Sequence, residues 1–251
     1  MDHPFMSLVI PAYNEQARLP AALSKLKAFL AKEPPHYEVL VVDDGSKDST
    51  PAIVNEAMAS FPELRLLREQ HRGKGHAVRK GMLAARGQYV MFCDADFSMP
   101  VEEVVKFSQA LSNGCEVAIG SREVQGARRI GEPWHRHLMG RVFNLLVRVM
   151  AIPGLQDTQC GFKAFTREAA QEIFGRQVID GFGFDVEVLY IARKMGMRIT
   201  EVPVNWYYSP SSRVDPIKDT IRMFNDVMQV RSNDRRGLYD RVADNSPAGV
   251  S

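Results

Sequence analysis

The stretch YVMFCDAD, residues 89–96, leads from five strand-forming residues directly into two carboxylates that are separated by one small residue. Pro100 then closes the segment. Ionised carboxylates next to a buried strand carry a large desolvation cost unless they are paired or bound to a metal. The pattern therefore fits either an acidic turn after a strand or a divalent-cation site formed by Asp94 and Asp96, and the rest of the chain has to decide between them.

Shorter apolar runs of the same kind lie upstream, and each is followed by a helical pattern or a helix-start signal. The apolar runs occupy residues 6–11, 37–42 and 64–67, and the helical signals follow at 19–30, 49–51 and 73–86. Strands that alternate with helices at this spacing indicate an α/β fold with a mostly parallel central sheet and helices on both faces. A chain of 251 residues is long enough to bury a core of this kind.

The composition excludes several other classes of protein. Hydrophobic residues make up 45% and charged residues 25%, which excludes disordered and fibrous proteins, and a net charge of +2 is too small to indicate a nucleic-acid partner. The three cysteines have no metal-ligand spacing and predict reduced core thiols. The sequence shows neither a signal peptide nor the run of about 18 apolar residues that a membrane span requires. We therefore expect a cytoplasmic protein that contacts a membrane only at its surface.

Polar clusters follow three of the predicted strands. Tyr13, Asn14 and Glu15 follow the first, Asp43 and Asp44 end the second, and Asp94 and Asp96 follow the strand at residues 89–93. Ligands of parallel α/β sheets bind at the carboxyl ends of the strands, so these clusters are expected to converge on one edge. Such an edge suits a nucleotide diphosphate held through Mg²⁺ or Mn²⁺, because these hard cations prefer carboxylate and phosphate oxygens.

A basic helix start, RGKG at residues 72–75, adds groups that bind phosphate. Lys74 supplies a cation, and the helix N-terminus supplies backbone donors and the positive end of the helix dipole. The spacing is not that of a P-loop, and no dinucleotide-binding glycine pattern follows the first strand. Kinase and dehydrogenase functions are thereby excluded.

The second half of the chain carries more ambiguous patterns. The basic segment 121–132 predicts a mobile loop near the same edge, or alternatively a solvated charged loop. Residues 134–150 predict a helix with a wide apolar face and a narrow basic stripe, packed under the domain or lying in a membrane interface. Asp185 is either a first-turn carboxylate favoured by the helix dipole or an inward-facing site residue. Residues 216–230 predict an amphipathic helix that is a second candidate for a membrane interface, and the chain from Ser232 predicts a frayed tail.

An ordered set of motifs resembles the family 2 glycosyltransferases, which have a GT-A fold. The upstream motifs are VIPAYNE at 9–15, VVDDGS at 41–46, GKG at 73–75 and DAD at 94–96. The downstream motifs resemble the dolichyl-phosphate β-glucosyltransferase branch and are GSR at 120–122, DTQCGFK at 157–163, GFDVE at 183–187 and SRV at 212–214. The resemblance implies one GT-A domain over residues 1–237, with a nucleotide-sugar half at 1–121, an acceptor half at 122–237 and a flexible tail at 238–251.

Together with the residue patterns, the resemblance implies roles for individual side chains. The expected nucleotide-sugar residues are Pro11, Ala12, Tyr13, Glu15, one of Asp43 or Asp44, Lys74, Asp94, Ala95 and Asp96. The expected metal ligands are Asp94 and Asp96, the expected acceptor-phosphate residues are Arg122, Arg128, Arg129 and Arg213, and the expected catalytic residues are Asp96, Arg122 and Asp185. Mannosyl relatives often have Gln two positions after the second Asp, where this chain has Ser98, which leaves a third metal ligand open and disfavours mannose.

The implied reaction is the inverting transfer of a hexose to a polyprenyl or dolichyl phosphate, with glucose from UDP-glucose favoured. The second pKa of a phosphate monoester is about 6, so this nucleophile needs no general base, and charge neutralisation and arginine clamping are expected to contribute most. Eukaryotic relatives of this branch begin with a membrane anchor that is not seen at the start of this sequence. We therefore expect peripheral contact with the cytoplasmic face of a membrane, through the helix at 134–150.

Alternative functions stay open at this point. One is a GDP-mannose-dependent polyprenyl-phosphate mannosyltransferase. Another is a family 2 transferase that acts on a soluble or polysaccharide hydroxyl, which requires a general base, with Asp185 as the first choice. The last is a non-catalytic nucleotide-sugar sensor, which the intact carboxylates and arginines disfavour.

Overall fold

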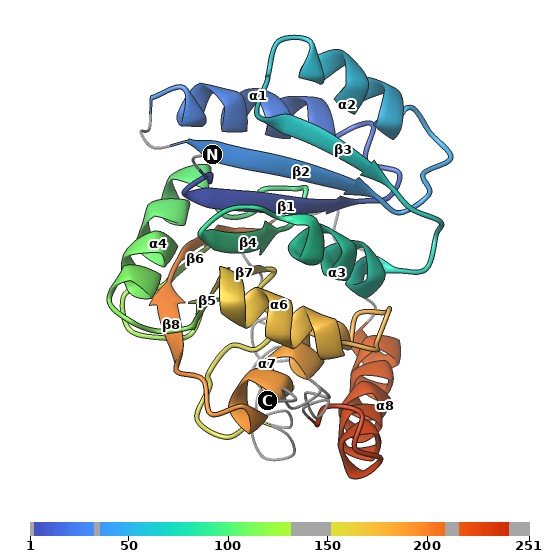
Figure 1. Cartoon of the computed structure of the whole chain (residues 1–251), viewed down its shortest axis with the longest axis vertical. Coiled ribbons are helices and arrows are strands. Elements are labelled where there is room, and N and C mark those ends of the chain that lie inside the picture. The colour runs from blue at the N-terminus through green and yellow to red at the C-terminus, as the bar shows by residue number, and fades with distance from the viewer. Residues whose placement is uncertain (1–2, 33–35, 132–151, 209–215, 241–251) are drawn as a thin grey trace, which may run out of the picture.

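The computed structural model describes residues 3–32, 36–131, 152–208 and 216–240, and its centre is a seven-stranded sheet (Figure 1). The strands are β1 Met6–Ala12, β2 Tyr37–Asp43, β3 Leu64–Arg68, β4 Tyr89–Cys93, β5 Val117–Ser121, β7 Phe162–Thr166 and β8 Ile199–Pro203. Their order across the sheet is β3-β2-β1-β4-β7-β5-β8. All neighbours are parallel except β7, which is antiparallel to both β4 and β5. The predicted mostly parallel sheet is confirmed, and strands from both halves of the chain share it.

Helices cover both faces of this sheet. They are α1 Leu19–Leu30, α2 Thr50–Met58, α3 Lys74–Ala84, α4 Val104–Ser112, α6 Arg167–Arg176, α7 Phe184–Lys194 and α8 Pro216–Arg235, and a 3-10 turn, η1 Val101–Glu103, precedes α4. Side chains of β1 alternate between the faces: Leu8 and Ile10 join the core under α1, α2 and α4, whereas Val9 joins the core under α3, α6 and α7. The helix α8 packs on α7, at the C-terminal end of the colour scale in Figure 1.

The sheet register brings the predicted polar clusters to one edge. Strand β1 pairs in parallel with both β2 and β4, and Ala12 lies opposite Asp43. The chain turns sharply at this edge, because Asn14 and Phe97 both adopt the left-handed region, with φ of 54° and 45°. The expected convergence is therefore confirmed for the ends of β1, β2 and β4.

The basic segment 121–132 is not wholly a loop. Residues Arg128–Ile130 form β6, which pairs in parallel with β9, Asn205–Tyr207. The prediction missed β6 because three residues carry too little periodicity to indicate a strand, and its partner lies far away in the sequence.

The C-terminal region also differs from expectation. The helix expected at 216–230 continues to Arg235, and Tyr239 is buried, so the prediction of a frayed chain from Ser232 is wrong for residues 232–240. The helix expected at 134–150 lies outside the described residues. None of the helices in the described part of the chain combines the length and apolar character needed to cross a bilayer.

Candidate active site

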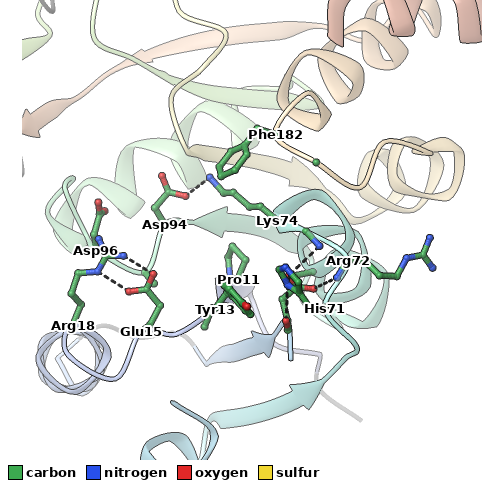
Figure 2. Close-up of a pocket in the computed structure, with 16 residues that line it drawn as sticks. Pro11, Tyr13, Glu15, Arg18, His71, Arg72, Lys74, Asp94, Asp96 and Phe182 are labelled. Carbon is green, nitrogen blue, oxygen red and sulfur yellow. Dashed lines mark hydrogen bonds and ion pairs between the residues drawn. The ribbon is translucent and has the colours of Figure 1, made fainter. Parts of the chain in front are cut away.

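A cavity of about 520 Å³ opens at the carboxyl edge of β1, β2 and β4 (Figure 2). Its lining includes nearly all the predicted nucleotide-sugar residues: Pro11, Ala12, Tyr13, Glu15, Asp44, Lys74, Asp94, Ala95 and Asp96. The lining also includes Arg72 and Gly73 of the predicted phosphate-binding helix start, together with residues that the sequence patterns did not single out: Arg18, His71, Ala77, Gly181 and Phe182. Segments far apart in the sequence therefore form one wall around this edge of the sheet.

The carboxylate of Asp44 organises the start of α3. Its Oδ1 accepts a hydrogen bond from the backbone N–H of Arg72 at 3.0 Å, and its Oδ2 accepts one from Gly73 at 3.0 Å. The Nδ1 atom of His71 lies 2.8 Å from the same Oδ2. Asp44 is buried, and its oxygens are directed at residues 71–73. It thereby fixes the loop that carries Lys74 into the cavity.

The rings of Tyr13 and His71 stack at the rim of the cavity. Their centroids lie 4.1 Å apart with an interplanar angle of 15°. Tyr13 is 37% exposed, so the pair presents an aromatic surface to the solvent. Figure 2 shows both side chains next to Pro11, beside the end of β1.

Asp43 does not line this cavity in the described structure. It is buried, and its Oδ1 accepts a hydrogen bond from the backbone N–H of Ser46 at 3.1 Å. Its Oδ2 is also buried and has no hydrogen-bond partner among the described residues. Of the two aspartates between which the sequence left a choice, the structure places Asp44 at the cavity and Asp43 beneath it.

Lys74 and Asp94 form an ion pair inside the cavity, with Nζ 2.6 Å from Oδ1 (Figure 2). Burial alone would lower the pKa of Lys74, but the carboxylates of Asp94, Asp185 and Asp96 raise it above its usual value. The ammonium also lies 5.9 Å from the ring centroid of Phe182. Lys74 is therefore a fixed positive charge at the N-terminus of α3.

A second ion pair lies on the opposite side of the cavity. The guanidinium of Arg18 contacts Glu15 through Nε–Oε2 at 2.7 Å and Nη2–Oε1 at 2.5 Å. Glu15 raises the pKa of Arg18 through its hydrogen bond and its charge, with smaller contributions from Asp96 and Asp94. Asp96 is exposed, and its Oδ1 accepts a hydrogen bond from the backbone N–H of Ser98 at 3.0 Å. Cations thus flank the two aspartates from both sides.

Asp185 lies next to this site without lining the cavity in the described structure. It is buried and forms an ion pair with Lys163, whose Nζ also donates to the carbonyl of Cys160 at 2.8 Å. Burial raises the pKa of Asp185, while Lys163 and Lys74 oppose that shift. Asp185 lies in the first turn of α7 and is buried, as the two interpretations respectively predicted, but its immediate partner is a lysine of β7, and its role as a site residue stays a prediction.

The arginines expected to clamp the acceptor also lie outside the cavity lining, as far as the chain is described. Arg122 binds the buried Asp157 through Nε–Oδ2 at 2.6 Å and Nη2–Oδ1 at 2.9 Å, and it lies over the ring of Trp206. Arg129 pairs with Glu123 at 2.5 Å. Arg128 is exposed on β6. Arg213 lies outside the described residues.

The backbone at position 161 lies so close to Asp94 that only glycine, the glycine of the DTQCGFK motif, fits there. A Cβ atom at this position would lie 2.0 Å from Asp94 Oδ2. Only a residue without a side chain lets the strand β7 pass so near the carboxylate. The antiparallel strand β7 therefore packs directly against the site residue at the end of β4.

The site and fold agree with the result of sequence comparison, in which glycosyl transferase family 2 matches residues 7–174. The chain is a family 2 glycosyltransferase. Dolichyl-phosphate beta-glucosyltransferase of Dictyostelium discoideum is 36% identical over 253 residues, which cover 95% of this chain and 77% of that protein. The human protein of the same name is 34% identical over 241 residues, which cover 90% of this chain and 74% of the relative.

Solved structures share the fold of this glycosyltransferase. Glucosyl-3-phosphoglycerate synthase from Mycobacterium tuberculosis, in complex with Mn²⁺, UDP-glucose and phosphoglyceric acid, matches with a TM-score of 0.67 at 21% identity. The match covers 92% of this chain and 80% of that one. The same enzyme has also been solved with Mg²⁺ and UDP, with a TM-score of 0.64 at 22% identity, covering 94% of this chain and 80% of that one.

The donor set of this glycosyltransferase fits a divalent cation of the kind that these neighbours contain. Asp94 and Asp96 supply hard carboxylate oxygens from one strand end, and one oxygen of Asp94 is paired with Lys74. No cluster of three or more His, Cys, Asp or Glu ligands occurs among the described residues. Mg²⁺ commonly binds through one or two carboxylates and completes its shell with water and substrate phosphate, so two aspartates are sufficient.

Some of the newly found lining residues had usable sequence signals. Arg18 lies three residues after Glu15, a spacing at which opposite charges pair at the start of a helix. His71 directly precedes the RGKG helix start. Phe182 had no such signal, because its position depends on long-range packing of the loop before α7 against α3.

Proposed function

We propose that this enzyme transfers glucose from UDP-glucose to a dolichyl or other polyprenyl phosphate, with inversion at the anomeric carbon. The observation that carries the proposal is that Asp94, Asp96, Lys74 and the N-terminus of α3 line one cavity, because this combination suits a nucleotide diphosphate and its cation. The curated relatives, named dolichyl-phosphate beta-glucosyltransferase, support the sugar and the acceptor. The neighbour that holds UDP-glucose supports the nucleotide.

The residues after β1 would bind the nucleoside. The Tyr13–His71 stack offers an aromatic surface for the base, and Pro11 lies beside it. Asp44 already accepts hydrogen bonds from the loop 71–73 through both of its oxygens. We therefore assign to Asp44 the positioning of that loop, and through it of His71 and Lys74.

The diphosphate would lie between the two aspartates and the start of α3. Asp94 and Asp96 would hold Mg²⁺ or Mn²⁺, which supplies Lewis-acid neutralisation of the departing UDP. Lys74 adds a positive charge in a partly water-excluded position, where it acts more strongly than in bulk water. The positive end of the α3 helix dipole lies at the same place and favours the same negative ligand.

An oxygen of the acceptor phosphate would act as the nucleophile without a general base, since the second pKa of this phosphate is about 6 and the group is already largely ionised at neutral pH. Asp185 is buried in an ion pair with Lys163, so it is neither exposed nor free to take a proton from an acceptor. This arrangement disfavours a hydroxyl acceptor that requires a general base. We assign to Asp185 the positioning of Lys163 behind the site.

The observed ion pairs change which arginine is the first candidate for binding the acceptor phosphate. Arg122 is engaged by two hydrogen bonds to Asp157, and Arg129 is paired with Glu123. Arg128 on β6 is exposed and becomes the first candidate for the acceptor phosphate. A polyprenyl chain is held in a bilayer, so the acceptor phosphate would lie at a membrane surface, and we propose the cytoplasmic face as the place of the reaction.

The proposed function is tested by counting lipid-linked glucose formed from labelled UDP-glucose, polyprenyl phosphate and Mn²⁺. Asp96→Ala is expected to reduce product by at least about a hundredfold, because it removes a carboxylate that holds the cation on the leaving group. Glu56→Ala removes an exposed carboxylate of α2 that is outside the cavity lining, so this control is expected to retain activity. Full activity of Asp96→Ala in metal-free buffer would contradict the proposal.

A further inference from the structure

The loop at residues 177–183, between α6 and α7, forms one wall of the cavity. Gly181 and Phe182 line it, and Phe182 lies over Lys74 in Figure 2. The loop packs against the first turn of α3: a Cβ atom on Gly73 or Gly75 would lie 2.6 Å from the carbonyl oxygen of Asp180 or Ile179, respectively. The position of this loop therefore sets both the shape of the wall and the surroundings of Lys74.

A buried carboxylate on α7 holds the loop in place. Glu187 Oε1 accepts a hydrogen bond from the backbone N–H of Val178 at 3.1 Å, and its Oε2 accepts one from Ile179 at 3.0 Å. Glu187 is fully buried, and burial raises its pKa while these hydrogen bonds oppose the shift. The carboxylate thus serves as the acceptor for two successive amides of the loop.

A third donor to Glu187 comes from the C-terminal segment. The hydroxyl of Tyr239 donates to Glu187 Oε1 at 2.7 Å, and Asn233 Nδ2 donates to the Tyr239 oxygen at 3.1 Å. Tyr239 is 1% exposed, four residues beyond the end of α8. A chain of hydrogen bonds therefore runs from Asn233 through Tyr239 and Glu187 to the amides of the cavity loop.

We propose that Tyr239 is a positioning residue for nucleotide binding, acting through Glu187 on the loop 177–183 that walls the cavity. The inference rests on the proposed function, since it takes the cavity as the nucleotide-sugar site. Removal of the hydroxyl leaves a buried carboxylate oxygen with one donor fewer, which is costly in a low-dielectric interior. Glu187 then holds the amides of Val178 and Ile179 less firmly, and the wall formed by Gly181 and Phe182 loses its fixed position.

The neighbouring Tyr190 provides a matched control. Its hydroxyl donates to the carboxylate of Asp234 at 2.6 Å, and its ring lies 6.1 Å from that of Tyr239. Tyr190→Phe therefore removes the same type of hydrogen bond, from a tyrosine hydroxyl to a carboxylate, but the carboxylate that loses its donor is Asp234 and not Glu187. Comparison of Tyr239→Phe with Tyr190→Phe separates an effect on the loop from a general loss of stability.

The experiment measures the UDP dissociation constant in the presence of Mn²⁺, the KM and kcat for UDP-glucose, and hydrogen exchange of the 177–183 peptide. Tyr239→Phe is expected to weaken UDP binding and raise the donor KM by about three- to tenfold, with kcat changed less than about twofold, and to speed exchange in the peptide. Tyr190→Phe is expected to leave all these values within about twofold of the wild type. Equal UDP affinity and equal exchange in both variants would overturn the inference.

A second variant covers the case in which Tyr239→Phe does not fold. Glu187→Gln keeps one acceptor oxygen but replaces the other with a donor group, which faces donors from the loop and Tyr239. Faster exchange of residues 177–183 with weaker UDP binding supports the inference, and unchanged exchange overturns it. Failure of the wild-type protein to bind UDP would instead contradict the proposed function, while the exchange data would still report whether Tyr239 controls the loop.

Discussion

Lys74 Nζ lies 2.6 Å from Asp94 Oδ1, and this ion pair joins the first turn of α3 to the end of β4. The pair sets a cation and a carboxylate side by side at the edge where ligands of parallel sheets bind. The carboxylate suits a divalent cation, and the ammonium suits the phosphate that such a cation accompanies. In the proposed function, Asp94 would hold the cation and Lys74 would contact the diphosphate, so this one ion pair joins both parts of the proposed site.

Replacement of Lys74 by Met is expected to lower kcat/KM for UDP-glucose by about a hundredfold, because it removes the charge that we propose to stabilise the leaving diphosphate. Steady-state kinetics measure the effect. Lys80→Met on the same helix is the control, since Lys80 is more exposed and pairs with Glu69 rather than with a cavity residue. A similar loss in both variants would argue that Lys74 contributes only to folding.

Gly161→Ala is expected to reduce activity strongly, because the new Cβ atom would lie 2.0 Å from Asp94 Oδ2 and displace the carboxylate. UDP binding with and without Mn²⁺ measures the displacement. Gly175→Ala is the control: its Cβ atom would meet nothing within 4 Å, and it lies within α6, where Ala is favoured by about 1 kcal/mol. An active Gly161→Ala enzyme with unchanged metal dependence would show that Asp94 need not occupy its observed position.

Asp157→Asn is expected to lower the free energy of unfolding at neutral pH by about 3 kcal/mol, because it breaks a buried ion pair with Arg122. Burial alone would raise the pKa of Asp157, but the charge and hydrogen bonds of Arg122 outweigh this effect and lower the pKa to about 2. Because the pKa of Asp157 is lower in the folded state than the unfolded-state value of 3.8, ionised Asp157 stabilises the fold at pH values above 3.8. The free energies of unfolding of the wild type and Asp157→Asn should therefore approach each other as the pH falls from about 4 to 2.

Denaturant titrations at several pH values measure this dependence. Glu172→Gln provides the control, since it removes an exposed i,i+4 pair with Arg176 that is worth at most about 0.5 kcal/mol. If the free energies of unfolding of the wild type and Asp157→Asn differed by the same amount from pH 7 to pH 2, the assignment of the low pKa to Asp157 would be contradicted.

Arg128→Ala is expected to raise the KM for polyprenyl phosphate by about tenfold while the UDP dissociation constant stays unchanged, because Arg128 lies outside the donor cavity. Initial rates at varied lipid phosphate measure the effect. Arg65→Ala serves as the control, since Arg65 pairs with Glu38 at the other end of β2 and β3. Unchanged lipid KM would remove Arg128 from the acceptor site.

The sequence was sufficient to predict the sheet edge and most of its lining. Alternation of apolar runs with helical patterns is a local signal, and parallel pairing then brings the ends of β1, β2 and β4 together. The lining residues Tyr13, Lys74, Asp94 and Asp96 could therefore be predicted, because each lies at or just after a strand end or at a helix start. Pro11 was implied by the family resemblance, and the choice between Asp43 and Asp44 stayed open until their burial and hydrogen bonds were known.

The partners of individual charges could not be predicted in the same way. The pairs Arg122–Asp157 and Lys163–Asp185 join residues 35 and 22 positions apart, and they depend on the insertion of β7 between β4 and β5. Burial of Tyr239 likewise depends on the packing of α8 against α7. Periodicity within one segment carries no information about such contacts.

A panel of sugar donors and acceptors tests the proposed reaction most directly. UDP-glucose, UDP-galactose and GDP-mannose are each supplied with Mn²⁺ and either a polyprenyl phosphate or a soluble sugar acceptor, and the labelled products are counted. The proposed enzyme is expected to form β-linked lipid-phosphate glucose from UDP-glucose and no product with the soluble acceptor. Preferential transfer from GDP-mannose, or transfer to the soluble hydroxyl in place of the lipid phosphate, would contradict the proposed reaction.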